Sequence, residues 1–410
     1  MRRIGLLGGT FNPVHKGHIY IAKEALSQLD LDEVWLLPAG APPHKEAGLC
    51  AARTDRLAMC RLACEDEPGL VVSEEEIFSA ETNYTERTLD RLVHRYPDTK
   101  FYFIIGQDSL EQFSTWKNPE KISSLAAIAA ANRTDQATES AEKTAQKLRG
   151  QFPGEFVILR TDNIPVSSTE IRNCFYDHAD TRYEQPMSDM IPRAEFDYIQ
   201  RHRLYQKPWN PRQDIKTIKD KLQTVLKPKR YAHVINVMNT CANLAMRYNY
   251  PMEEAVYAGL LHDCAKYMSD QQLLVYCREH EISVTAEEKA APYLLHAKAG
   301  AYMAKEVYGI DCPRIQEAIR LHTTGDAKMT LLSEILFVAD YIEPARNEAK
   351  NLTDIRSISY LDLDLAIAVI SENTLDYLKE KGAAVDSKTR RTYEYYRKKV
   401  KEKREHQGES

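Results

Sequence analysis

The sequence predicts a doubly wound parallel α/β sheet of the Rossmann-like kind, followed by an all-α domain. Over residues 1–207, short apolar runs bounded by glycine and proline alternate with stretches of helical period, which is typical of parallel strands joined by helices. Residues 208–213 hold two prolines and no apolar periodicity, which indicates a linker. Over residues 214–396 strand patterns are absent and nearly every segment is amphipathic, so this part is expected to be helical.

Length and composition are those of an ordinary globular protein. The 410 residues suffice for two to three domains of roughly 150 residues each. Hydrophobic residues make up 43% and charged residues 28%, and the net charge of −5 argues against a surface that binds duplex nucleic acid. The strongly basic residues 397–410 are therefore expected to form a solvated helix end and frayed tail, and not a nucleic-acid arm.

Cysteine usage and hydropathy indicate a cytoplasmic protein. The eight cysteines include no CxxC pair and are interpreted as thiols of a reducing cytosol. No stretch approaches about 18 apolar residues, and the first apolar run is far too short for a signal peptide. We expect no membrane partner, and the sequence leaves the oligomeric state open.

The first strand run, residues 4–7, ends in a loop suited to phosphate. Gly8 and Gly9 let the backbone approach a ligand closely, so bare N–H groups can contact it. The loop continues through Thr10 and Phe11, and helical periodicity begins shortly afterwards. Because a helix N-terminus attracts anions, we expect a phosphate to bind here.

Two histidines, His15 and His18, lie at the start of this helix. As an isolated pair they would be surface side chains or half of a metal site. A helical HExxH zinc site needs a glutamate where this chain has Lys16, and no cysteine nearby supplies a thiolate. The preceding glycines favour phosphate as the ligand instead.

Polar residues also follow the next two strand runs. Residues 34–38 precede a Pro-Pro loop that ends in Lys45, which is either a solvated lysine or one held within reach of a phosphate. Residues 101–105 precede Gly106 and Asp108, and this carboxylate either accepts hydrogen bonds from a ribose or caps the next helix. The carboxyl ends of parallel strands meet at one edge of a sheet, where ligands bind.

The segment SSTEIR, residues 167–172, begins another helix after the strand run 156–159. Ser167 and Glu170 have the spacing of a capping box. The same N–H groups and hydroxyls can bind a phosphate chain, and Arg172 adds a rigid fork of donors. Capping and phosphate binding are compatible here.

Two of these segments resemble the signatures of a known family. GGTFNPVHKGH, residues 8–18, is similar to the (H/T)xGH signature of nucleotidyltransferases in the form typical of bacterial nicotinate mononucleotide adenylyltransferases. SSTEIR resembles the second signature of that family. Residues 42–45 and 190–205 match it as well, so the resemblance covers about residues 1–206.

The resemblance implies transfer of AMP from ATP to nicotinate mononucleotide, giving deamido-NAD and pyrophosphate, with Mg²⁺ accompanying ATP. The attacking phosphate is already ionised at neutral pH, so positioning and charge stabilisation suffice without a catalytic base. The implied catalytic residues are His15, His18, Lys45 and Arg172. The implied ATP-binding residues are Gly8, Gly9, Thr10, Phe11, Gly106, Asp108, Ser167, Ser168 and Thr169.

Three further residues are implied to bind the mononucleotide, namely Thr85, Trp116 and Arg133. Trp116 could equally be a core aromatic residue. The alanine-rich run before Arg133 departs from the family pattern, so this residue is the weakest match.

Residues 214–396 carry a second constellation of four histidines and two aspartates, distributed over separate helical segments or helix ends. They are His233, His262, Asp263, His296, His322 and Asp340. An isolated histidine of this kind would be an ordinary core or surface side chain. The six together offer nitrogen and oxygen donors suited to Fe or Mn, without a thiolate to favour structural zinc.

The order of these residues resembles the HD phosphohydrolase superfamily, through RYAH at residues 230–233, LLHDCAK at 260–266 and ADYIEP at 339–344. It is more closely similar to bacterial HD proteins that split diadenosine tetraphosphate into two ADP. This resemblance implies two divalent metals, Fe or Mn, held by the six residues, with Asp263 as the bridging ligand. Lys266 and Arg346 would then hold the polyphosphate, or else be merely solvated.

Two alternatives remain open. The transferase could use another acceptor, such as phosphopantetheine or a flavin, although SSTEIR and residues 42–45 favour a pyridine mononucleotide. The HD domain could bind a nucleotide as a regulatory module without cutting it, although a sensor has no need of six metal-binding side chains. The sequence does not distinguish nicotinate from nicotinamide mononucleotide, nor show whether the two sites are coupled.

Overall fold

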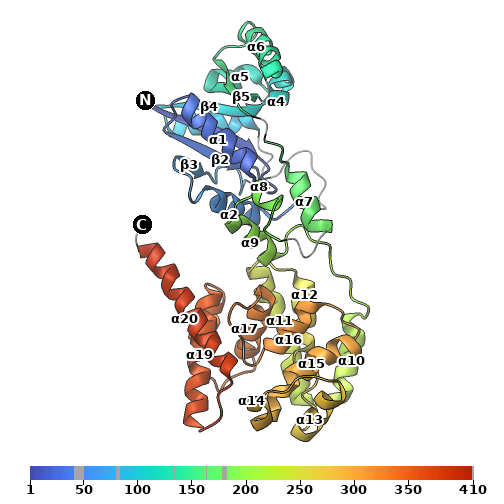
Figure 1. Ribbon diagram of the computed structural model, residues 1–410. Helices are drawn as coiled ribbons and strands as arrows, with labels where there is room; N and C mark the ends of the chain where they lie inside the picture. Colours follow the sequence, from blue (N-terminus) through green and yellow to red (C-terminus); the bar gives the residue numbers. More distant parts are fainter. Residues whose placement is uncertain (41–49, 80–83, 133–134, 163, 178–181, 409–410) are drawn as a thin grey trace. The chain divides into compact units, whose positions relative to one another are not determined.

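The computed structural model describes residues 1–410 except 41–49, 80–83, 133–134, 163, 178–181 and 409–410. The chain folds into two compact units, residues 1–207 and 208–410 (Figure 1). Each unit has a hydrophobic core of its own.

The first unit is built on a six-stranded sheet whose neighbouring strands are all parallel. The strands are β1 (Arg2–Gly9), β2 (Glu33–Pro38), β3 (Leu70–Val72), β4 (Thr99–Gly106), β5 (Ala127–Asn132) and β6 (Phe156–Arg160), in the order β3-β2-β1-β4-β5-β6. This confirms the predicted doubly wound fold. Strand β3 was not predicted, because three residues are too few to produce a periodic signal.

Helices connect the strands and cover both faces of the sheet. They are α1 (Lys16–Gln28), α2 (Arg53–Cys64), α3 (Thr85–Arg95), α4 (Gln107–Glu111), η1 (Phe113–Thr115), α5 (Pro119–Leu125), α6 (Asp135–Arg149), α7 (Ser168–Asp177), α8 (Met187–Met190) and α9 (Arg193–His202). Strand β1 shows the result: Ile4 and Leu6 enter one hydrophobic cluster and Leu7 enters the other. Burial on both faces explains why the strands are continuous apolar runs in the sequence.

The strand order creates a topological switch between β1 and β4. From β1 the chain proceeds to β2 and β3 on one side, and then returns to β4 on the other side of β1. Doubly wound sheets bind ligands in the crevice at the carboxyl ends of two such strands. Gly9 at the end of β1 and Gly106 at the end of β4 therefore lie at the edge expected to hold a site.

The second unit consists of helices, and its described residues include no strand. The helices are α10 (Ile215–Val225), α11 (Pro228–Arg247), α12 (Met252–Leu261), α13 (Asp270–Glu279), α14 (Ala286–Ala290), η2 (Pro292–Leu294), α15 (Leu295–Glu306), α16 (Pro313–Leu321), α17 (Leu331–Ile342), α18 (Leu352–Ser359), α19 (Leu363–Glu380) and α20 (Ser387–Gly408). Helices α11, α12, α16 and α17 pack against one another around one continuous core. This confirms the predicted all-α fold of the second half.

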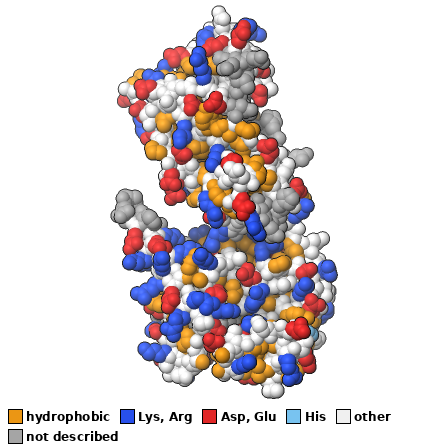
Figure 2. All heavy atoms as spheres, viewed as in Figure 1, with side chains coloured by type: hydrophobic (Ala, Val, Ile, Leu, Met, Phe, Trp, Pro, Cys, Tyr) orange, Lys and Arg blue, Asp and Glu red, His pale blue; other side chains and the backbone are white. Residues whose placement is uncertain are grey.

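The basic residues 397–408 continue helix α20, which corrects the expected frayed tail. Lys399 and Lys403 form 2.8 Å ion pairs with Asp364 and Asp362, at the start of α19. The helix is thus fixed by carboxylates of its own unit. On the face shown in Figure 2, Lys and Arg side chains are interspersed with Asp and Glu. Within the described part of the chain, no helix has the length and apolar character needed to cross a bilayer.

Candidate functional sites

The loop after β1 folds its own aromatic ring beneath the backbone. Phe11 adopts a φ of +47° and is 2% exposed. A Cβ atom on Gly9 would lie 3.0 Å from the Phe11 ring, so a larger residue there would displace the ring. The exposed Gly8 and the half-buried Thr10 complete a loop whose backbone stays open to a ligand.

The two histidines of the first motif lie against each other at the N-terminus of α1. The rings of His15 and His18 are stacked with centroids 3.6 Å apart, and the His15 N–H donates to Nδ1 of His18 over 3.2 Å. A Cβ atom on Gly17 would approach Nδ1 of His15 to 3.1 Å, which explains the glycine between them. The Phe11 ring meets the His18 ring edge-on, with centroids 5.0 Å apart. The pair is therefore held by packing where the helix dipole favours an anion.

The second motif is tied directly to the first. Arg172 Nη1 donates to the Asn12 carbonyl over 2.8 Å, and Ser168 Oγ donates to the Pro13 carbonyl over 2.8 Å. The other Arg172 branch donates to Thr169 Oγ1 over 3.1 Å. The start of α7 is thereby fixed beside the loop that precedes the histidines.

The predicted capping box is present at the start of α7. Ser167 donates to Glu170 Oε2 through its N–H over 2.9 Å and through its hydroxyl over 2.8 Å. The Glu170 N–H donates back to Ser167 Oγ over 3.2 Å. The Ser167 hydroxyl is therefore engaged locally, while Thr169 remains exposed.

Asp108 is an exposed carboxylate at the carboxyl end of β4. Helix α4 has Gly106 as its N-cap, and Asp108 lies in its first turn. Its carboxylate makes no hydrogen bond or ion pair with any residue that the structure describes. The capping alternative is therefore wrong for this residue, and its carboxylate faces solvent where a ribose could reach it.

The residues predicted to bind the mononucleotide differ in their burial and in whether the structure describes them. Thr85 is the first residue of α3 and is half-buried. Trp116 packs against Phe103 and Phe113, with ring centroids 6.2 and 5.5 Å away, and remains partly exposed, so it contributes to the core and to the surface. Lys45 and Arg133 lie outside the described residues.

One set of hydrogen bonds in this site was not predicted. The side-chain oxygen of Asn12 accepts hydrogen bonds from the Tyr205 hydroxyl and from the Ala51 N–H, both over 2.9 Å. Asn12 lies inside the first motif, and Tyr205 ends the closing segment that also matched the family. Nothing in their spacing indicates that they meet.

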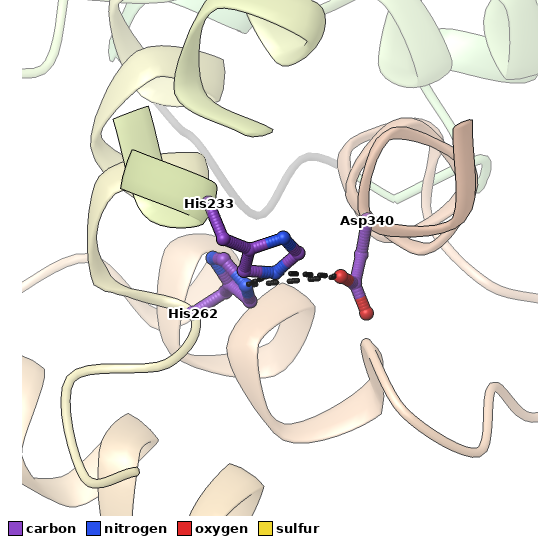
Figure 3. Close-up of side chains that lie close together, drawn as sticks. All are labelled: His233, His262 and Asp340. Atoms are coloured by element: carbon purple, nitrogen blue, oxygen red, sulfur yellow. Dashed lines mark hydrogen bonds and ion pairs between the residues drawn. The ribbon is translucent and has the colours of Figure 1, made fainter. Parts of the chain in front are cut away.

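In the second unit, the six predicted metal-binding residues come together. His233 lies on α11, His262 and Asp263 follow α12, His296 begins α15, His322 follows α16 and Asp340 lies on α17. Figure 3 shows His233, His262 and Asp340 pointing toward one another from α11, from the turn after α12 and from α17. The set contains two groups of three whose ligand atoms lie within 4.8 Å of one another.

Asp263 stands between two groups of histidines. Its Oδ2 lies 3.5 Å from His262 Nε2 and 3.8 Å from His233 Nε2. Its Oδ1 lies 3.3 Å from His296 Nε2 and 3.7 Å from His322 Nε2. One oxygen therefore faces each group, which is the geometry of a bridging carboxylate.

Each histidine ring is oriented by its other nitrogen. Nδ1 of His262 contacts the Gly259 carbonyl at 2.7 Å, and Nδ1 of His322 contacts the Ile319 carbonyl at 2.7 Å. In His296, Nδ1 lies 2.5 Å from the Tyr293 carbonyl. These carbonyls select the tautomer with a proton on Nδ1 and a lone pair on Nε2, as metal-binding histidines require.

His233 is oriented by a buried carboxylate instead. Its Nδ1 lies 3.2 Å from Glu343 Oε1, and Glu343 also accepts from Asn236 Nδ2 over 3.1 Å and from the Ala345 N–H over 2.7 Å. The Nε2 atom of His233 then lies 3.1 Å from Asp340 Oδ1. Glu343 was not predicted, although it stands one helical turn beyond Asp340 within ADYIEP.

The protonation states of these groups favour the binding of a cation. Burial, with the charges of Lys266 and His322, lowers the pKa of His296 to about 3, so this ring is neutral. Burial opposes the ionisation of Asp263 and Asp340, but the surrounding histidines hold the pKa of both carboxyls well below the usual range. The cluster thus combines ionised carboxylates with imidazole nitrogens, a donor set that fits divalent metal ions.

Cationic side chains surround the cluster. Arg230 pairs with Asp263 Oδ2 at 2.7 Å, and Arg346 pairs with Asp340 Oδ1 at 3.3 Å. Lys266 Nζ lies 3.1 Å from both nitrogens of the His296 ring. Lys266 and Arg346 were predicted here. Arg230 was not, although it lies one helical turn before His233.

Comparisons with known proteins agree with the two units. A cytidylyltransferase-like family model matches residues 6–174, and an HD domain model matches residues 230–345. A probable nicotinate-nucleotide adenylyltransferase of a Synechococcus strain is 39% identical over 207 residues, which cover 50% of this chain and 98% of that protein. A protein of Mycoplasma pneumoniae named probable nicotinate-nucleotide adenylyltransferase/Ap4A hydrolase is 28% identical over 379 residues, covering 91% of this chain and 98% of that protein.

One solved structure is similar to the second half. It is a predicted HD superfamily hydrolase from Clostridium acetobutylicum, described as involved in NAD metabolism, with 36% sequence identity and a TM-score of 0.44. The match covers 46% of this chain and 98% of that one.

Proposed function

We propose that this chain transfers AMP from ATP to nicotinate mononucleotide. The chain belongs to the nicotinate-nucleotide adenylyltransferase family, and an HD domain follows that unit in the sequence. A phosphate oxygen of the mononucleotide attacks the α-phosphorus of ATP, and the bond between this phosphorus and the bridging oxygen breaks. Pyrophosphate leaves and deamido-NAD is formed.

The observation that carries this proposal is the tie between the two motifs. Arg172 and the His15–His18 pair belong to segments far apart in the chain, and the Arg172–Asn12 hydrogen bond of 2.8 Å unites them at the edge where β1 ends. Donors clustered at a helix N-terminus stabilise the charge that develops at the α-phosphate. In this proposal His15, His18, Lys45 and Arg172 contact the phosphates, and Mg²⁺ accompanies ATP.

The remaining predicted residues complete the substrate contacts. Gly8 to Phe11 and the start of α7 offer backbone N–H groups and hydroxyls to ATP, and Asp108 accepts hydrogen bonds from a ribose. Thr85, Trp116 and Arg133 bind the mononucleotide. The partners are therefore small molecules. We also propose a cytoplasmic location, because all eight cysteines are free thiols.

The transfer is tested by incubating the full chain with Mg²⁺-ATP and either nicotinate or nicotinamide mononucleotide. We expect deamido-NAD with the nicotinate substrate. His18→Ala should reduce kcat by roughly a hundredfold or more, as losses of single charge-stabilising donors do. His94→Ala is the matched control, because His94 is exposed on α3 and, among the described residues, hydrogen-bonds to the Asp90 carbonyl of its own helix. Near-normal kcat in His18→Ala would refute the role of this histidine.

We further propose that the HD domain hydrolyses diadenosine tetraphosphate to two ADP. The carrying observation is Asp263, with one oxygen toward His233 and His262 and the other toward His296 and His322. Two divalent ions held there, Fe by preference and Mn otherwise, would supply a hydroxide at neutral pH and neutralise phosphate charge. Asp340 completes the set of ligands.

The side chains around the cluster would bind the polyphosphate. Arg230, Lys266 and Arg346 are cations within 4 Å of the cluster residues, and arginine presents forked donors that match phosphate oxygens. These cations come from α11, from the segment after α12 and from the segment after α17. Because they approach the cluster from three elements, they favour binding of several linked phosphates over a single phosphate.

This second activity is tested with diadenosine tetraphosphate and Fe²⁺ or Mn²⁺. The double variant His262→Ala/Asp263→Ala should lose bound metal and ADP release while retaining adenylyl transfer. His280→Ala is the control, since His280 lies at the end of α13 and packs against the Tyr276 and Tyr302 rings, outside the cluster. Tight binding without cleavage in the wild-type chain would favour the regulatory alternative instead.

A further inference from the structure

Arg56 is the largest fully buried side chain of the protein's described residues. It lies on α2 and is 1% exposed, in a helix whose sequence gives it no obvious reason to be inside. Arginine is almost never fully buried unless it is paired. Its surroundings must therefore explain why the chain keeps a charge there.

The guanidinium of Arg56 bridges the two loops that leave strands β1 and β2. Its Nη1 donates to the Thr10 carbonyl over 2.7 Å, and its Nη2 donates to the Gly40 carbonyl over 3.3 Å. The ladder between the two strands ends just before, where the Ala39 N–H donates to the Gly9 carbonyl over 2.9 Å. Arg56 thus continues the cross-strand connection beyond the last backbone hydrogen bond.

Both loops are confined at these points. A Cβ atom on Gly40 would lie 2.5 Å from the Glu76 carbonyl oxygen, so the backbone packs too closely there for any side chain. Thr10 lies between Gly9 and the buried Phe11 of the phosphate-binding loop. One planar guanidinium therefore connects the backbone at Thr10 to the backbone at Gly40.

Within the described residues, Arg56 forms no ion pair with a carboxylate, and its Nε has no hydrogen-bond acceptor. Burial lowers the pKa of Arg56 from its usual range, but a guanidinium remains protonated at neutral pH. A buried positive charge acts over a longer range than a solvated one, because the medium screens it less.

We infer that Arg56 is a positioning residue for ATP: it holds the backbone after β1, at Thr10, against the backbone after β2, at Gly40, at the edge of the sheet that receives the phosphate chain, and its buried charge attracts that chain. The inference rests on the proposed adenylyl transfer, because it gives ATP as the ligand of this edge. Arg56 contacts the loop backbone and not the substrate. It therefore acts through the Thr10 and Gly40 carbonyls and through its field.

The test compares Arg56→Met, which removes charge and donors, with Arg56→Lys, which keeps the charge but cannot span both carbonyls. Arg53→Met is the matched control, because Arg53 lies on the same helix and donates to the Ser79 carbonyl over 2.9 Å. Steady-state kinetics give KM for ATP and for nicotinate mononucleotide separately. Calorimetry gives the Kd of ATP, and thermal unfolding of the full chain reports on folding.

For Arg56→Met we expect KM and Kd for ATP to rise roughly ten- to hundredfold, the range for losing a charged hydrogen-bond donor, with KM for the mononucleotide within about twofold. Arg56→Lys should fall between Arg56→Met and wild type. The dependence of kcat/KM for ATP on ionic strength should be weaker in Arg56→Met than in Arg56→Lys, because only the methionine variant loses the charge.

If KM rises equally for ATP and for the mononucleotide, Arg56 is only structural. The same conclusion follows if the Kd of ATP is unchanged in either variant. If Arg56→Met does not fold, the same comparison of KM for ATP with KM for the mononucleotide is made in Arg56→Lys. If the wild-type chain forms no deamido-NAD, the proposed transfer fails, whereas the Kd of ATP still tests Arg56 by itself.

Discussion

Arg172 donates a 2.8 Å hydrogen bond to the carbonyl of Asn12, a residue that precedes it by 160 positions. This bond joins the two motifs from which the transferase site is built. It also fixes the direction of the guanidinium, since the same side chain reaches Thr169 Oγ1 over 3.1 Å. In the proposed site, we therefore expect the forked shape of the guanidinium to matter as well as its charge.

Arg172→Lys should reveal this requirement. Lysine keeps the charge but offers no planar fork, so we expect kcat/KM for ATP to fall roughly ten- to hundredfold while the midpoint of thermal unfolding changes little. Arg193→Lys is the control, because Arg193 lies outside both motifs, where it pairs with Asp197 on its own helix and lies over the Tyr183 ring. Wild-type kcat/KM in Arg172→Lys would show that charge alone suffices.

Tyr205→Phe should destabilise the first unit without large loss of buried area. The Tyr205 hydroxyl donates to Asn12 Oδ1 over 2.9 Å, and both side chains are buried. Loss of this hydrogen bond should cost about 0.5–1.5 kcal/mol, because Asn12 Oδ1 still accepts from the Ala51 N–H. Chemical denaturation of the full chain measures this change, with Tyr20→Phe as the partly exposed control. A change below about 0.5 kcal/mol would contradict the importance of this bond.

Much of the fold followed from local pattern. The strands around Ile4, Leu36 and Phe101 are buried on both faces, and such strands give continuous apolar runs that are visible in a sequence. The cluster from His233 to Asp340 could equally be predicted, because histidine is an uncommon residue, with 12 in the chain, and four of them occur here in one ordered motif with two aspartates.

Contacts between distant segments could not be predicted in this way. Arg56 occupies a helix with neighbouring charges, where a solvated side chain is the ordinary expectation, but in the structure it is buried against the Thr10 and Gly40 carbonyls. Tyr205 and Asn12 meet because the closing segment returns to the first strand. Such pairs depend on tertiary geometry, which no spacing in the sequence encodes.

Glu343→Gln should weaken metal binding in the HD domain. Glu343 is 4% exposed and lies 3.2 Å from His233 Nδ1, so its charge orients the ring and strengthens its Nε2 as a donor. Loss of such a partner typically reduces metal affinity 10- to 100-fold. Metal titration of the full chain measures this, with the exposed Glu348→Gln as control. Equal metal affinity in both variants would refute the orienting role of Glu343.

Glu195→Met should stabilise the first unit and flatten its pH dependence. Glu195 on α9 is fully buried, and neither carboxyl oxygen has a hydrogen-bond partner in the described structure. Burial raises its pKa well above the usual value, so the folded chain holds a proton that the unfolded chain releases above about pH 4.3. The stability contributed by this group is thus greatest below that pH and declines as pH rises toward the folded-state pKa.

At pH 8, replacing this unpaired acid by methionine should raise the free energy of unfolding by roughly 1–3 kcal/mol, and the gain should shrink toward pH 4. Denaturant unfolding of the full chain at several pH values measures both effects. Glu139→Met is the comparison, because Glu139 is a solvent-exposed surface residue on α6. A gain in Glu195→Met that does not depend on pH would mean that the carboxyl group is ionised in the folded chain, since only a proton retained on folding makes stability fall as pH rises.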